Sequence, residues 1–151
     1  MASECKPAAD ASDETAVRRL IDGLANAWNR GDARAYSERY QPDGTFTNVN
    51  GSLFVGREAF EQRHAEIFSG IYKDVRLSLT IKRLSFIRPD VALVDLDAAL
   101  DAAASRVRMM PSGVQAGPDG VLHTSLQMVL VKESDGWWIA SYHNVWLAAG
   151  G

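Results

Sequence analysis

Residues 91–100 read VALVDLDAAL, and this stretch decides the fold class. Its apolar side chains recur at every second position, so one face of an extended chain is wholly apolar while the other carries Asp95 and Asp97. This alternation is typical of a strand with one face on a core and one in solvent. We predict a half-buried antiparallel strand here. Its inward residues are Ala92, Val94, Leu96, Ala98 and Leu100.

Strand patterns continue on both sides of this segment. Alternation begins upstream at Val75, but its apolar phase jumps between Ile81 and Leu84, as one extra residue in a β-bulge would cause. Downstream we predict strands over residues 121–133 and 137–146, joined by a turn at residues 134–136. The Gly- and Pro-containing stretch from about 105 to 120 is predicted to be an irregular loop that is mobile or borders a site.

The chain before this meander has a helical period. Apolar residues from Val17 to Trp28 share one helix face, with Asp13 as the expected N-cap and Gly31 as the expected stop. A shorter helix is predicted from Asp32 to about Tyr40, and a turn at residues 42–44 ends it.

A short hairpin and a third helix complete the expected elements. Strands are predicted over residues 45–49 and 53–55, with Asn50-Gly51 as a two-residue turn. The helix between Arg57 and Gly70 carries His64 within an apolar stripe.

Helices followed by a long meander indicate an α+β fold. We predict a cone-shaped, curved antiparallel sheet of about six strands, covered by three N-terminal helices. One domain is expected over residues 13–147, with a flexible tail at 1–12 and a C-terminal tail at 148–151.

Composition excludes several classes of function. The net charge of -3 gives no basic surface for nucleic acid, and the single Cys5 cannot form an internal disulfide. No run of about 20 apolar residues suggests a membrane span, and the polar first dozen residues do not read as a signal peptide. We expect a cytoplasmic protein.

Three local motifs carry a family resemblance. They are Ala27-Trp28-Asn29-Arg30-Gly31-Asp32, Pro42-Asp43-Gly44-Thr45-Phe46 and Asp135-Gly136-Trp137-Trp138-Ile139. In this order they resemble the nuclear transport factor 2-like superfamily. Residues 47–51, 63–68 and 142–144 look most like its SnoaL-like group, the one named after SgcJ and EcaC, a distant relative of ketosteroid isomerase.

The resemblance implies a cone with an internal pocket, frequent dimerisation through the outer sheet face, and functions from isomerases, cyclases and dehydratases to domains without catalysis. Ketosteroid isomerase combines a carboxylate base with a tyrosine and a protonated aspartic acid. Aligned on the shared motifs, this chain has Leu24, Asn48 and Met128 there, so that mechanism is not expected. No glycine-rich dinucleotide loop or cysteine cluster is present, so we expect neither cofactor nor metal.

Three residues are the candidate catalysts. His64 could act as a general base near neutral pH, or be a buried histidine satisfied by a backbone carbonyl. Strict alternation puts His143 on the concave face of the last strand, where it would meet His64 and Asn48. Such a cluster could bind or polarise a carbonyl or hydroxyl group.

The expected pocket wall comes from several elements, although some members could be plain core or, for Asp43, a turn residue bonded to its own backbone. The wall residues are Trp28, Tyr40, Asp43, Phe60, Met128 and Ser141.

The same alternation puts Trp138, Tyr142 and Trp146 on the outer face, an aromatic patch that a homodimer would bury. We therefore expect a SnoaL-like domain that binds a small apolar, oxygen-bearing metabolite, with or without cofactor-independent catalysis. The alternative is a non-catalytic dimerisation or protein-interaction module.

Overall fold

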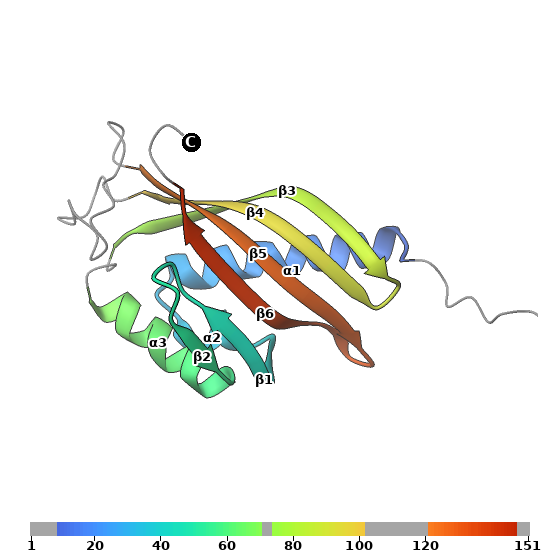
Figure 1. Cartoon of the computed structure of the whole chain (residues 1–151), viewed down its shortest axis with the longest axis horizontal. Coiled ribbons are helices and arrows are strands. Elements are labelled where there is room, and N and C mark those ends of the chain that lie inside the picture. The colour runs from blue at the N-terminus through green and yellow to red at the C-terminus, as the bar shows by residue number, and fades with distance from the viewer. Residues whose placement is uncertain (1–8, 71–73, 102–120, 148–151) are drawn as a thin grey trace, which may run out of the picture.

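The computed structural model describes residues 9–70, 74–101 and 121–147. Six strands form one curved sheet in the order β2-β1-β6-β5-β4-β3, and helix α1 runs across its back while α2 and α3 lie beside β1 and β2 (Figure 1). The helices are α1 (Ala11–Asn29), α2 (Ala33–Ser37) and α3 (Arg57–Ser69). The strands are β1 (Tyr40–Thr47), β2 (Leu53–Val55), β3 (Arg76–Arg88), β4 (Val91–Asp101), β5 (Val121–Glu133) and β6 (Gly136–Trp146). The predicted α+β cone is confirmed, with a sheet that does not close on itself.

One strand pair differs from the expected antiparallel sheet. Strands β3 to β6 form an antiparallel meander and β1 pairs antiparallel with β2, but β1 and β6 run parallel. The chain leaves β2 through α3 and crosses the whole meander before it returns, so β6 arrives beside β1 in the same direction. This pairing joins the short hairpin to the large sheet.

Two of the four register shifts in the described sheet change which side chains of β3 and β6 face the core. The bulge predicted between Ile81 and Leu84 is present, because the pairing with β4 shifts between Ile81 and Arg83. A second one was not predicted. Leu130 pairs with Ile139 and Val129 with Ser141, so Ala140 is the extra residue of β6. Beyond it, every side chain of β6 faces opposite to strict alternation.

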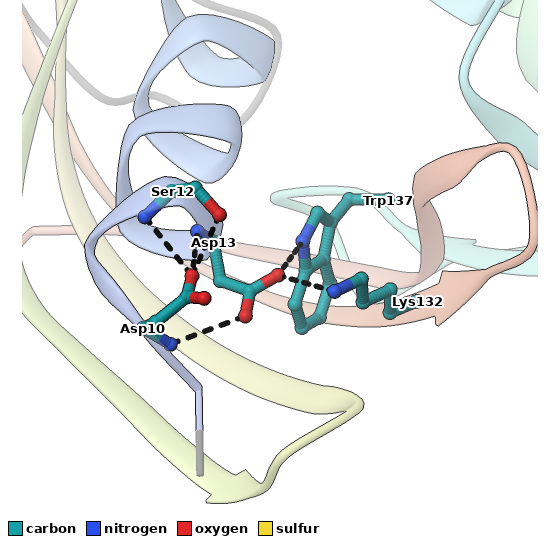
Figure 2. Close-up of polar contacts among 5 residues, drawn as sticks. All are labelled: Asp10, Ser12, Asp13, Lys132 and Trp137. Atoms are coloured by element: carbon teal, nitrogen blue, oxygen red, sulfur yellow. Dashed lines mark hydrogen bonds and ion pairs between the residues drawn. The ribbon is translucent and has the colours of Figure 1, made fainter. Parts of the chain in front are cut away.

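Helix α1 begins at Ala11, inside the stretch predicted as a tail, and its N-cap is Asp10 rather than Asp13. Asp10 accepts from the Ser12 and Asp13 amides, and Asp13 accepts from the Asp10 amide, which makes a capping box. Figure 2 shows that Asp13 also reaches the sheet, where its Oδ1 lies 2.7 Å from Lys132 Nζ and 3.3 Å from Trp137 Nε1. The cap therefore joins α1 to β5 and β6.

The other end of α1 is fixed to the edge strand β3. The Asn29 amide donates to the Leu77 carbonyl at 3.1 Å and accepts from the Leu77 amide at 2.8 Å, as a neighbouring strand would. Trp28 Nε1 donates to the Val75 carbonyl at 2.9 Å. Gly31 follows with φ of +67°, as expected of a helix stop. These contacts satisfy part of an otherwise open sheet edge.

Helix α2 is shorter than predicted and β1 longer. The chain leaves the helix after Ser37 because the Arg39 carbonyl accepts from the Ile139 amide, which starts the parallel pairing. Tyr40 then stacks on Phe60 of α3 with ring centroids 4.1 Å apart, inside the core.

The first hairpin has a longer turn than the predicted two residues. Thr47 and Leu53 form the last pair, so residues 48–52 make the connection, and Gly51 adopts φ of +82°. The expected strand therefore ends two residues earlier than Val49.

Some predictions fall outside the described residues. These are most of the tail at 1–12, the loop at 105–120 and the C-terminal tail. Within the described ranges, no helix is long and apolar enough to cross a membrane.

Candidate ligand-binding cavity

A cavity of about 170 Å³ lies between α3 and the end of the sheet where β4 and β6 finish and β5 begins. Helix α3, the green helix in Figure 1, supplies Arg63, His64, Glu66 and Ile67 to its lining. Most of its lining comes from α3, the first hairpin and the C-terminal half of β6. The lining residues are Trp28, Phe46, Asn48, Val49, Asn50, Arg63, His64, Glu66, Ile67, Leu100, Thr124, Tyr142, Asn144 and Trp146.

Aromatic rings form much of the wall around His64. Its ring centroid lies 5.2 Å from Phe46 and 6.2 Å from Trp28, and Phe46 lies 5.2 Å from Tyr142. All four side chains are buried. The rings are inclined to one another by 57–73°, so they give the cavity an apolar wall that offers both ring faces and ring edges.

His64 is the titratable group inside this wall. Its Nδ1 lies 2.8 Å from the Phe60 carbonyl, which can only accept, so Nδ1 carries the proton and Nε2 is an acceptor that no described residue uses. Burial lowers the pKa of His64 to about 4, and the neighbouring Arg63 charge adds to this. At neutral pH the ring is therefore uncharged. The sequence left open that His64 is satisfied by a backbone carbonyl. This is so for Nδ1, while Nε2 stays available to a ligand.

A buried tyrosine pair lies next to His64. The hydroxyls of Tyr36 and Tyr142 are 2.8 Å apart, and burial raises the pKa of Tyr142 to about 12. Only Tyr142 lines the cavity. When Tyr36 donates to Tyr142, the remaining hydroxyl proton of Tyr142 is free to reach a ligand.

Four side chains of the cavity lining each carry a polar atom that is buried and has no hydrogen-bond partner among the described residues. These atoms are Arg63 Nε, Thr124 Oγ1, Asn144 Oδ1 and Trp146 Nε1. Thr124 is fully buried and lies directly opposite Trp146 in the β5–β6 pairing, and Asn144 is two residues from Trp146 on the same face. A buried polar atom without a partner costs about 1–3 kcal/mol, so four such side chains around one cavity make it the candidate site for a ligand.

The charged groups at the cavity are a pair on α3. Arg63 Nη1 lies 3.4 Å from Glu66 Oε2, and both side chains are partly exposed. The contact is long for a hydrogen-bonded ion pair, and it uses only one nitrogen of the guanidinium.

Asn48, His64 and Trp28 line the cavity as expected from the sequence. Asn48 Oδ1 is already engaged, because it accepts from the Asn50 and Ser52 amides at 3.0 and 2.9 Å and so fixes the hairpin turn. Its amide nitrogen is the group left for a ligand. Catalytic roles for His64 and Asn48 stay predictions.

The prediction that His143 faces the cavity is wrong. It is exposed and pairs with Gln127 and Thr47 on the outer face of the sheet, because the Ala140 bulge reverses the alternation. Ser141 lies on the same outer face, 3.3 Å from the Thr45 hydroxyl.

The remaining expected wall residues do not line the cavity. Tyr40, Phe60 and Met128 are buried in the core, which is the alternative that the sequence left open for Tyr40 and Met128. Asp43 is exposed next to Pro42.

The predicted outer aromatic patch is also wrong. Tyr142 is only 4% exposed, and Trp146 lines the cavity. Trp138 alone stays on the outer side, where the Arg39 guanidinium lies 4.0 Å from its ring centroid. A homodimer through the outer face stays a prediction, without the patch that motivated it.

Sequence reasoning missed Arg63, Thr124, Tyr142, Asn144 and Trp146 as site residues. Arg63 adjoins His64, but nothing in a helical pattern shows that its Nε is buried. For Tyr142, Asn144 and Trp146, strict alternation predicted the outer face, because it did not include the bulge at Ala140. Thr124 alone among them carried a signal, since it is a hydroxyl on the apolar face of β5.

The family model of the SnoaL-like domain matches residues 17–146. The chain belongs to the SnoaL-like domain family. None of the curated protein sequences is significantly similar to this SnoaL-like domain.

Solved structures share the fold of this SnoaL-like domain. An uncharacterized protein with a cystatin-like fold from Caulobacter vibrioides is 26% identical, with a TM-score of 0.77 over 91% of this chain and 92% of its own. A ketosteroid isomerase-like protein from Erwinia carotovora is 18% identical, with a TM-score of 0.69 and coverages of 92% and 99%. A Novosphingobium aromaticivorans protein, named provisionally as a scytalone dehydratase, is 14% identical, with a TM-score of 0.72 and coverages of 91% and 85%.

Proposed function

We propose that this SnoaL-like domain binds a small, mainly apolar metabolite with oxygen atoms in the cavity under α3. The observation that carries the proposal is that four side chains lining one aromatic-walled space each hold a buried polar atom without a partner among the described residues. A ligand with both an apolar body and hydrogen-bonding oxygens would satisfy them.

The size of the cavity limits the ligand. An apolar cavity of about 150 Å³ in another protein holds benzene. The described cavity of about 170 Å³ therefore suits one substituted ring better than a steroid-sized one.

Cofactor-independent proton transfer is the second candidate function. His64 has the free Nε2 that a general base needs, and Tyr142 can donate to an oxygen of the ligand. Two structural neighbours carry names of isomerase-like and dehydratase type. A histidine with a pKa of about 4 is a weak base at neutral pH, so binding is the stronger of the two proposals.

The test is a screen of single-ring oxygenated compounds, read by NMR through the indole N–H signals of Trp28 and Trp146. We expect hits to move these two signals and to leave those of Trp137 and Trp138 in place, because only the first two line the cavity. The matched variants are Thr124→Val in the cavity and Thr80→Val on exposed β3. Hits that bind Thr124→Val as tightly as the parent, or that move only Trp138, would place the ligand elsewhere.

A further inference from the structure

We propose that the cavity selects a planar ring that bears a carboxylate, and that the guanidinium of Arg63 is the carboxylate receptor. This inference rests on the proposed function, because it names the class of ligand for the same cavity. It follows from the direction of the unpartnered groups and from the free edge of Arg63.

The unpartnered groups are mainly donors. Arg63 Nε and Trp146 Nε1 can only donate, and the Thr124 hydroxyl can donate or accept. Asn144 can offer its NH₂ group instead of its oxygen by turning its amide. A ligand with more than one acceptor oxygen matches the two donors, and it matches Thr124 and Asn144 when these also donate.

One edge of the Arg63 guanidinium makes no hydrogen bond. Its Nη1 lies 3.4 Å from Glu66 Oε2, and no other hydrogen bond or ion pair of Arg63 is found within the described residues. Nε and Nη2 are the two N–H groups of the other edge, and this is the geometry that binds both oxygens of a carboxylate. Nε is buried in the empty protein, so a carboxylate that binds both groups has to displace the atoms that cover Nε.

The charged side chains of the lining are one cation and one anion, and the anion is the more exposed of the two. His64 is neutral at pH 7, so the ionised groups of the lining are Arg63 and Glu66. Glu66 is 58% exposed and holds Arg63 at 3.4 Å, so it is a weak partner that solvent can replace. A carboxylate bound on the buried edge would keep the arginine charge neutralised after Glu66 moves away.

The ring is inferred from the wall. Trp28, Phe46, Tyr142 and Trp146 surround the same space, and aromatic faces favour stacked or edge contacts with a flat ring. With about 170 Å³ available, one ring and its substituent fill the cavity.

The experiment compares benzoate with benzamide and benzyl alcohol, which keep the ring and replace the carboxylate by neutral groups. Dissociation constants come from NMR titration of the Trp28 and Trp146 indoles at pH 7. We expect benzoate to bind about tenfold or more tightly than benzamide, because hydrogen bonds to an ionised partner are the stronger ones.

Four variants test the receptor. Arg63→Met and Arg63→Gln should remove the preference for benzoate while benzyl alcohol still binds, which also shows that the variants fold. Glu66→Gln should strengthen benzoate binding about two- to fivefold by removing a competing carboxylate. Arg18→Met is the matched control, since Arg18 pairs with Glu14 on exposed α1 and should leave the preference unchanged.

The two proposals fail in different ways. Equal affinity for benzoate and benzamide, or a preference that survives Arg63→Met, would overturn the carboxylate receptor and leave a neutral-ligand cavity. Absence of any indole shift at millimolar concentration of all three probes would overturn the binding proposal itself.

Discussion

Thr124 lowers the stability of the empty protein, because its side chain carries a buried polar group in the cavity lining. Its hydroxyl lies fully buried on the inner face of β5 with no partner among the described residues. Removing such a group in favour of an apolar one of the same shape relieves its desolvation cost.

We expect Thr124→Val to raise the free energy of unfolding of the empty protein by about 1 kcal/mol. Urea denaturation checks this against Thr80→Val, where the hydroxyl is exposed. The same variant should bind the cavity ligand less well. Stability equal to or below that of the parent would mean that the hydroxyl has a partner in the empty protein.

His64 makes stability depend on pH at the residue scale. Its folded pKa of about 4 lies below the ordinary 6.5, so the unfolded chain binds a proton that the folded chain does not. Above pH 6.5 both states are neutral and the full stability is present. As pH falls from 6.5 to about 4 the stability decreases, by about 3 kcal/mol for a shift of this size.

Urea unfolding at several pH values measures this loss. His64→Gln cannot take up the proton, so we expect its stability to fall less steeply between pH 6.5 and 4. His143→Gln is the control for losing an imidazole, since it lies exposed on the outer face. A parallel fall in parent and His64→Gln would contradict a buried neutral His64.

At the scale of elements, Asp13 joins the start of α1 to the sheet. It closes the capping box with Asp10 and accepts from Lys132 and from buried Trp137 (Figure 2). The hydrogen bond to Lys132 is the main reason that the pKa of Asp13 is lowered. The stabilising effect is therefore present above pH 3.8 and is lost as pH falls through the folded pKa.

We expect Asp13→Ala to lower the free energy of unfolding by about 2 kcal/mol, because it removes the Asp13 half of the capping box and leaves the Trp137 N–H without its partner. Denaturant unfolding followed by tryptophan fluorescence measures the change. Asp22→Ala, on the exposed side of α1, should be nearly neutral. An equally small effect of Asp13→Ala would show that the helix start is not coupled to the sheet.

Across the whole molecule, the sequence predicts the facing of a strand only where one face is polar and the other apolar. In β3 the bulge was visible because polar residues mark one face, so the jump from Ile81 to Leu84 breaks a clear pattern. In β6 large aromatic residues occupy both faces, so either phase fits and the bulge at Ala140 left no trace. The strands and helices could be predicted. The direction in which the side chains after Ala140 of β6 point could not.

The candidate site was predictable only where local pattern fixes it. His64 sits on an apolar helical stripe, and its place in the cavity follows from helix period alone. Arg63, Thr124 and Asn144 meet through tertiary packing of α3 on β5 and β6. The sequence pattern cannot predict which of their polar atoms lack a partner, because that depends on how the elements pack together.

Ala140 lets the last strand lose one residue without an exchange of its faces. Its deletion would leave a regular strand in which Asn144 and Trp146 still face inward and His143 still faces outward, because Ala140 is the one residue that interrupts the pairing with β5. We expect the Trp146 emission to stay unshifted in an Ala140 deletion variant with the other three tryptophans replaced by phenylalanine, and a red shift would contradict this. The cavity wall therefore tolerates a shortening of the chain at this position, whereas a deletion within residues 142–146 would reverse the facing of the residues that follow it.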